Sequence, residues 1–154
     1  MSELLGLEKI GIELDEEIPY TIIENYIFGI QGLSANKKLF ILMIRKYAGS
    51  KQTPAFPSYS TLMKDIGVSK RNVISKNIDF FIWLHWLEKI PRKDTENNKS
   101  ITNLYILSLK NIQLVLKHFN NNSYKFKEIE KCFELEYKSD SKKEFLSKTC
   151  KYLK

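Results

Sequence analysis

The chain of 154 residues is 43% hydrophobic and 28% charged, and it carries a formal net charge of +7. This composition is that of a folded globular protein and excludes a disordered chain, while the length excludes a large multidomain enzyme. The longest unbroken apolar run, residues 80–84, excludes a membrane span, which needs about 20 apolar residues. Two cysteines, Cys132 and Cys150, exclude a disulfide framework in a chain without an export signal, so we expect a cytoplasmic protein.

The charge is unevenly distributed along the chain. Residues 1–33 hold one lysine against seven acidic residues, residues 34–109 hold thirteen basic against five acidic residues, and residues 110–154 hold eleven against six. A basic body favours a polyanionic partner, because Lys and Arg gain affinity by releasing the counterions condensed on phosphates. A solvated lysine-rich surface explains the same numbers, so charge alone leaves nucleic-acid binding open.

The first elements in chain order are an acidic N-terminal arm and a helix. Residues 1–33 show no clear periodicity, and the run around Pro19 predicts extended chain. Ser34 is a suitable N-cap, and apolar residues at helical spacing predict a helix over residues 35–48. Two prolines within residues 51–57 then predict a connecting loop.

Residues 56–73 are the most informative stretch of the chain. Ser58 predicts the N-cap of a short helix, and Gly67 supplies the positive φ that ends this helix sharply. Ser69 predicts the cap of a second helix, which runs to about residue 84. Two short helices joined by a glycine turn are typical of a helix-turn-helix. The polar and cationic first turn of the second helix has the composition with which a recognition helix reaches base edges and phosphates.

The next two segments predict a hairpin. Residues 86–93 and 101–109 both have the composition of strands, and seven polar residues, 94–100, separate them. Beside a helix-turn-helix, such a hairpin with a long tip is a wing. We therefore expect a mainly α fold with a small antiparallel β-hairpin, in which residues 34–109 form a winged helix-turn-helix and C-terminal helices follow.

The C-terminal extension, residues 110–154, predicts three further helices: one ending near residue 119, one around residues 126–133 and one over residues 141–153. Their order repeats that of residues 34–84. Two interpretations remain open, a degenerate second helix-turn-helix and a packing lid. In the first case its basic face consists of Lys142, Lys143, Lys148 and Lys151.

The end of the second helix needs a covering surface. Residues 80–84 are apolar on every side of a helix, whereas one small core covers a single stripe. The N-terminal arm, the C-terminal helices or a second copy of the chain can bury Phe80 and Trp83. An intramolecular lid is preferred, and a homodimer through Phe80, Trp83 or the C-terminal helices is the other option.

The pattern Phe-Pro-Ser-Tyr-x-x-Leu-x-x-Asp-x-Gly-Val-Ser-x-Arg-x-Val over residues 56–73, with the hairpin closing on Asn-Leu-Tyr-Ile-Leu, resembles winged helix-turn-helix domains of plasmid and phage replication initiators and of conjugative-element and repressor proteins. The resemblance covers about residues 30–109, and it implies double-stranded DNA as the partner. His85 stands where such domains usually have glycine. By position, the resemblance implies DNA contacts at the major groove by Ser69, Lys70, Arg71, Asn72, Ser75 and Lys76, and from the wing by Arg92, Lys93, Asn97, Asn98 and Lys99.

Motifs for catalysis are missing from the sequence. The glycines form no phosphate-cradling or dinucleotide motif, His85 and His118 are far apart, and no carboxylate pair suggests acid–base chemistry. We expect no enzyme, no cofactor and no metal ion. The leading hypothesis is a non-catalytic double-stranded DNA-binding protein of a mobile element (plasmid, phage or conjugative element), acting in replication initiation, transfer or transcriptional control. The alternative is a winged-helix protein–protein interaction module that uses the aromatic surface of Phe80 and Trp83.

Overall fold

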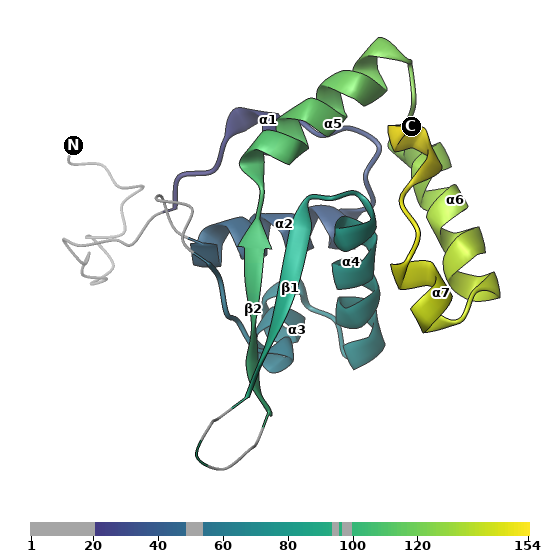
Figure 1. Ribbon diagram of the computed structural model, residues 1–154. Helices are drawn as coiled ribbons and strands as arrows, with labels where there is room; N and C mark the ends of the chain where they lie inside the picture. The colour runs from purple at the N-terminus through teal and green to yellow at the C-terminus, as the bar shows by residue number, and fades with distance from the viewer. Residues whose placement is uncertain (1–20, 49–53, 94–95, 97–99) are drawn as a thin grey trace, which may run out of the picture.

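The computed structural model describes residues 21–48, 54–93, 96 and 100–154. These residues form a winged helical core with C-terminal helices beside it (Figure 1), which confirms the predicted fold class. None of the helices in these ranges is long and apolar enough to cross a membrane. The elements in chain order are α1 (Asn25–Phe28), α2 (Ala35–Ala48), α3 (Tyr59–Ile66), α4 (Arg71–Trp83), β1 (Leu87–Lys93), β2 (Ser100–Leu107), α5 (Leu109–Asn121), α6 (Phe126–Ser139), α7 (Lys142–Leu146) and the 3₁₀ helix η2 (Lys151–Leu153).

The helix-turn-helix is formed by α3 and α4, with α2 packed behind them. The Ser58 hydroxyl accepts the Thr61 amide at 3.1 Å, and Gly67 ends α3 in the left-handed region with φ 83°. The predicted cap at Ser69 is wrong. Lys70 is the last extended residue before α4, and its side chain makes no capping hydrogen bond. Ser69 lies one residue before the N-cap position, which is too far for its hydroxyl to reach the first free amides of α4.

The wing is an antiparallel pair of strands, as predicted. Leu87 pairs with Leu107 at its base, and the register shifts beside Pro91, which lacks the amide that a regular ladder needs. The amide and carbonyl of Ala55 bond with those of Tyr105 at 2.9 and 2.7 Å. These two bonds tie the loop before α3 to the wing.

The turn between α4 and β1 depends on a left-handed histidine. His85 has φ 62°, and its amide donates to the carbonyl of Ile82 at 2.9 Å. The amide of Trp86 donates to the carbonyl of Phe81 at 3.0 Å, and the two rings stack with centroids 5.6 Å apart. These contacts make a Schellman ending, in which glycine is the usual left-handed residue. His85 therefore takes the position that glycine usually occupies in this turn, and its left-handed backbone is strained.

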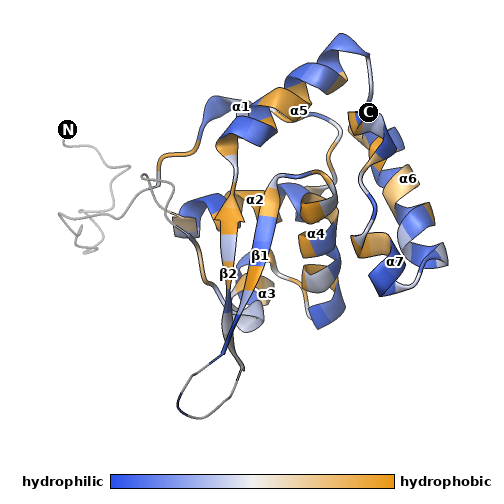
Figure 2. Ribbon diagram, viewed as in Figure 1, coloured by the Kyte–Doolittle hydropathy of each residue, from blue (hydrophilic) through white to orange (hydrophobic). Residues whose placement is uncertain are grey.

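The C-terminal helices provide the second covering surface that the end of α4 needs. Phe80 is 0% exposed and Trp83 is 2% exposed. The Phe133 ring of α6 lies 5.0 Å from the Phe80 ring and 5.5 Å from the Trp83 ring, and the Phe145 ring of α7 lies 6.4 Å from Trp83. In Figure 2, α4, α6 and α7 each carry apolar and polar residues on different sides, as expected for helices that bury one face.

This packing corrects two of the expectations. Because Phe80 and Trp83 are buried inside their own chain, they provide no exposed aromatic surface. A homodimer through these two residues and an interaction module that uses them therefore both lack the surface that they require.

Polar contacts also fix α6 to the start of α2. The Glu130 carboxylate accepts the Ser34 amide at 3.1 Å and lies 3.4 Å from the ammonium group of Lys37. Lys37 is buried, and its ammonium group lies 5.2 Å from the centre of the Phe80 ring. The lid formed by α6 and α7 is thus attached to two helices of the winged domain.

The helix predicted over residues 141–153 is wrong, because α7 covers only five residues and η2 three. The Ser147 hydroxyl donates to the carbonyl of Glu144 at 2.6 Å, which competes with a continuing helix. The chain then leaves the helical path so that Cys150 is buried, with its amide 3.4 Å from the carbonyl of Trp83. The four lysines assigned to one helical face therefore do not share a helix.

The described part of the N-terminal arm packs against the winged domain. Ile27 of α1 is fully buried, and Ile30 nearly so. The Glu24 carboxylate accepts hydrogen bonds from the Arg45 guanidinium, at 2.5 and 3.3 Å from Nε and at 3.0 Å from Nη2. The arginine holds the pKa of Glu24 below its ordinary value. Residues 1–20, which carry most of the arm's acidic charge, lie outside the described residues.

Candidate nucleic-acid interface

The start of α4 is open to solvent. Ser69, Lys70, Arg71 and Asn72 are all exposed. The Arg71 guanidinium lies over the Tyr59 ring of α3, 4.5 Å from its centre. This cation–π contact orients the arginine at the junction of the two helices without burying it. The first turn of α4 therefore presents a polar and cationic end, as a recognition helix requires.

The second turn is engaged by the C-terminal lid. Ser75 and Lys76 are half-buried, and the ammonium group of Lys76 lies 2.5 Å from the Glu134 carboxylate of α6 and 5.8 Å from the centre of the Tyr137 ring. The two charged side chains remain 35% and 47% exposed. An ion pair this exposed contributes about 0.2–1 kcal/mol, so a DNA phosphate can compete with Glu134 for Lys76.

The third turn is closed. Asp79 is 1% exposed, and the Tyr137 hydroxyl donates to its carboxylate at 2.8 Å. Burial, and then this hydrogen bond, raise the pKa of Tyr137, so the hydroxyl keeps its proton at neutral pH. A buried carboxylate in this position neither reads a base nor approaches a phosphate. The part of α4 that is open to DNA is therefore its first two turns.

The wing places one cation in a defined position. The Arg92 Nε donates to the carbonyl of Thr102 across the hairpin at 2.7 Å, and its guanidinium lies 5.3 Å from the centre of the exposed Phe56 ring. Lys93 is exposed at the end of β1. The other predicted wing contacts, Asn97, Asn98 and Lys99, lie outside the described residues.

A polar groove joins the start of the recognition helix to the wing. It has a volume of about 340 Å³ and lies between the start of α3, the start of α4 and strand β2. Arg71 forms part of its wall together with the Ser58 and Ser60 hydroxyls, and Thr102 and Asn103 line the opposite side. A nucleic-acid backbone in this groove meets hydroxyl, amide and guanidinium donors, which are the groups that contact phosphates.

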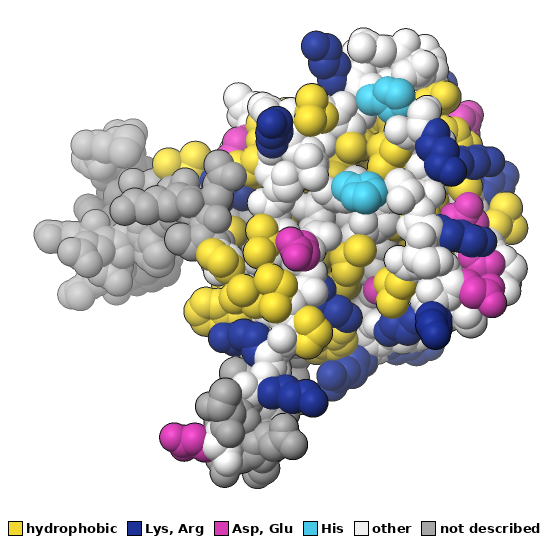
Figure 3. Space-filling model, in the orientation of Figure 1, with side chains coloured by type: hydrophobic (Ala, Val, Ile, Leu, Met, Phe, Trp, Pro, Cys, Tyr) yellow, Lys and Arg dark blue, Asp and Glu magenta, His cyan; other side chains and the backbone are white. Residues whose placement is uncertain are grey.

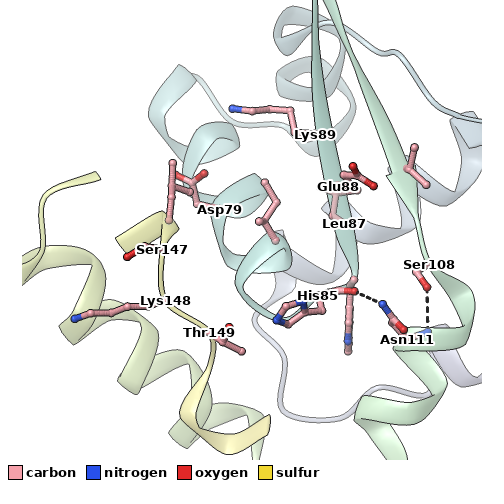
Figure 4. A pocket seen from close by; sticks show the side chains of 14 residues that line it. Asp79, His85, Leu87, Glu88, Lys89, Ser108, Asn111, Ser147, Lys148 and Thr149 are labelled. Carbon is pink, nitrogen blue, oxygen red and sulfur yellow. Dashed lines mark hydrogen bonds between the residues drawn. The ribbon is translucent and has the colours of Figure 1, made fainter. Parts of the chain in front are cut away.

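A second groove, of about 580 Å³, lies between α4, β1 and residues 146–149 (Figure 4). The Asn111 side-chain amide donates to the carbonyl of His85 at 2.8 Å, and the Asn111 backbone amide donates to the Ser108 hydroxyl at 3.2 Å. These bonds fix the turn after α4 and the start of α5, which is a structural role. Within the described part of the chain, no group of three or more His, Cys, Asp or Glu side chains could hold a metal ion.

The sequence did not indicate the contacts of α6 with the recognition helix. Glu134 and Tyr137 each lie 58 positions from their partners in α4. Helical periodicity identifies the buried face of α6 but not the element that it meets, so no local signal pairs these residues.

One of three comparisons with known proteins finds a match. Neither the curated proteins nor the solved structures give one. Residues 31–79 match a family model described as a helix-turn-helix domain. The matched segment contains α2, α3 and the first two turns of α4, and it includes the α3 and α4 side of the polar groove but not the β2 side. This match supports a helix-turn-helix DNA-binding domain in that segment, with DNA as its partner.

Proposed function

We propose that this chain is a non-catalytic protein that binds double-stranded DNA, with the first two turns of α4 in the major groove and the wing against the backbone. The observation that carries this proposal is the exposed, cationic start of α4, residues 69–72, beside the wing. The polar groove between them supports it, because it aligns donors from α3, α4 and β2.

The side chains at this face differ in what they recognise. Arg71 has the bidentate geometry that suits guanine, and Asn72 has the amide that suits adenine, so we assign these two residues to base edges. Ser69, Lys70, Ser75 and Lys76 suit phosphates beside the groove, where contacts position the protein without reading sequence. In the wing, we assign contacts with phosphates or with the minor groove to Arg92, Lys93, Asn97, Asn98 and Lys99.

We further propose that the protein belongs to a mobile element and serves replication initiation, transfer or transcriptional control. The support is the resemblance of residues 56–73 to the domains of plasmid and phage initiators. A cytoplasmic location is consistent with this role. The alternative interaction module has no supporting observation, because its aromatic residues Phe80 and Trp83 are buried.

Duplex binding by matched double variants tests the proposal. The Lys70→Ala/Arg71→Ala variant removes two charges at the start of α4, and Lys110→Ala/Lys117→Ala removes two exposed charges on α5, at the opposite end of the molecule (Figure 1). Fluorescence anisotropy with duplexes selected from a random pool measures the affinity at several salt concentrations. We expect the first variant to lose about 1–3 kcal/mol of binding free energy, and its salt slope to fall by about 2, while the control stays close to the wild type.

Two results would contradict the proposed function. One is a wild-type protein that binds no duplex at low salt. The other is a Lys70→Ala/Arg71→Ala variant whose affinity equals that of the α5 control. Selection with Arg71→Ala alone adds a test of base readout, since it is expected to relax the sequence preference at one position of the site.

A further inference from the structure

Basic side chains extend beyond the wing and the start of α4. Figure 3 shows Lys and Arg side chains along the lower edge of the molecule, from the base of the wing to the region of α6 and α7. The acidic side chains visible in this view lie above that edge or at the tip of the wing. On α6 and α7, the exposed lysines at the lower end are Lys138, Lys142 and Lys143.

The packing of α6 against α4 places these lysines at the DNA-facing end of the recognition helix. Phe133 contacts Phe80, and one turn further along α6 Tyr137 contacts Lys76, one turn nearer the start of α4. The two helices are therefore antiparallel, and the end of α6 lies level with the first turn of α4. Figure 1 shows the lower ends of α4, α6 and α7 at the same side of the molecule.

Two of the four neighbouring acidic groups, Glu134 and Asp140, pair with other lysines, whereas Glu136 and Glu144 make no ion pair within 4.0 Å among the described residues. Glu134 pairs with Lys76, and Asp140 pairs with Lys148 at 2.7 Å. Asp140, by its hydrogen bond, and then Glu136 and Glu144 by their charge raise the pKa of Lys148. Among the described residues, the three lysines at the lower end make no ion pair within 4.0 Å. Their charge is therefore available to an anionic partner.

We propose that Lys138, Lys142 and Lys143 form a second contact surface for the DNA sugar-phosphate backbone, on the side of the recognition helix opposite the wing. This inference rests on the proposed function. It makes the C-terminal extension part of the DNA interface in addition to its role as a lid, and it predicts that the protein holds both backbones that border one major groove.

The dimensions of the partners explain this arrangement. The major groove is about 12 Å wide, which one α-helix with its side chains fills. Because α6 packs beside the recognition helix through the large rings of Phe80, Trp83 and Phe133, its end is positioned over the phosphates that border the groove. The wing occupies the corresponding position over the other strand. Three lysines beside one DNA strand suit the regularly spaced phosphates of its backbone.

The salt dependence of binding by full-length variants tests this surface. The variant Lys138→Gln/Lys142→Gln/Lys143→Gln removes three charges while keeping polar side chains of similar helix propensity. The control Lys110→Gln/Lys117→Gln/Lys127→Gln removes the same charge from exposed positions on α5 and the start of α6. Each phosphate contact contributes about 0.9 to the slope of log K against log salt concentration. We expect the first variant to lose about 2–3 from this slope and the control to lose less than about 1.

The outcomes separate the two proposals. If the wild type binds DNA and Lys70→Ala/Arg71→Ala weakens it, while the two triple variants have equal slopes, the second surface is refuted and the proposed function stands. If the wild type binds no duplex, both fail. Thermal unfolding checks folding, since exposed lysine substitutions are expected to change the Tm by no more than about 2 °C. A further variant, Lys142→Gln/Lys143→Gln, replaces the triple variant if that one unfolds, and it is expected to lose about 2 from the slope.

Discussion

Replacement of Phe133 by alanine tests whether the C-terminal lid supports the recognition helix. Phe133 is fully buried, and its ring centre lies 5.0 Å from Phe80, 5.5 Å from Trp83, 5.1 Å from Tyr137 and 5.4 Å from Phe145. These neighbours belong to α4, α6 and α7. Removing the ring therefore leaves a cavity at the point where all three helices meet.

The expected loss is large compared with the stability of a small domain. A buried Phe→Ala substitution costs about 3–5 kcal/mol, because transfer of the ring and the residual cavity both contribute. Domains of this size have free energies of unfolding of about 5–15 kcal/mol. Leu135→Ala on the same helix is the matched control, since Leu135 is 68% exposed and its truncation is expected to cost less than about 1 kcal/mol.

Urea unfolding followed by tryptophan fluorescence measures both effects. Trp83 reports on the contacts with the middle of α6 and with α7, and Trp86, whose ring contacts Phe81 of α4 and Phe126 at the start of α6, reports on the centre of the core, so a Trp83→Phe background isolates the second signal. We expect one cooperative transition in both backgrounds, since the lid and the domain share a core. A loss in Phe133→Ala no greater than that in Leu135→Ala would refute the burial of α4 by α6. Separate transitions for the two tryptophans would refute the shared core.

Three further predictions concern the turn, the arm and the lid. His85→Gly is expected to raise the free energy of unfolding by about 0.5–1 kcal/mol in urea titrations. The reason is that relief of about 1–2 kcal/mol of left-handed strain exceeds the cost of the extra chain entropy of glycine. A loss of stability would show that the imidazole side chain itself stabilises the fold. The depressed pKa of Glu24 contributes stability above its unfolded-state pKa, and this is lost as the pH falls through the folded-state pKa. Between about pH 6 and pH 3 the wild type should therefore lose more stability than Glu24→Gln, and equal losses would argue against the ion pair. Glu134→Gln releases Lys76, so duplex affinity in anisotropy titrations should rise by up to about fivefold relative to Glu128→Gln, which removes the same charge at the start of α6; an unchanged affinity would place Lys76 away from the DNA.

Local chemistry made the helix-turn-helix predictable. The apolar spacing before residue 49 gave the observed bounds of α2, and Ser58 and Gly67 mark the two ends of α3 because each provides a backbone interaction or a φ angle that few residues offer. The hairpin followed from two β-rich runs around a polar segment. In contrast, the cap at Ser69 was wrong by one residue, since several polar residues in succession leave the exact helix start undetermined.

Contacts distant in sequence account for the other errors. The final segment has helical spacing, yet the burial of Cys150 beside Trp83 outweighs its helix propensity and divides it into α7 and η2. The apolar end of α4 showed that another element must bury Phe80 and Trp83, but it did not identify that element. The aromatic contacts of Phe133 and the polar contacts of Glu130 decide that this cover is α6.

By itself, the sequence determined the winged helix-turn-helix and its cationic first turn, because capping residues, turn residues and periodicity act within a few positions. Tertiary structure alone decided how much of the recognition helix remains open to DNA. Tyr137 closes its third turn, Glu134 pairs with its second, and the antiparallel packing of α6 brings further lysines to its exposed end. These effects depend on which apolar faces meet, and that choice minimises the exposed apolar surface of the whole chain and not of any one segment.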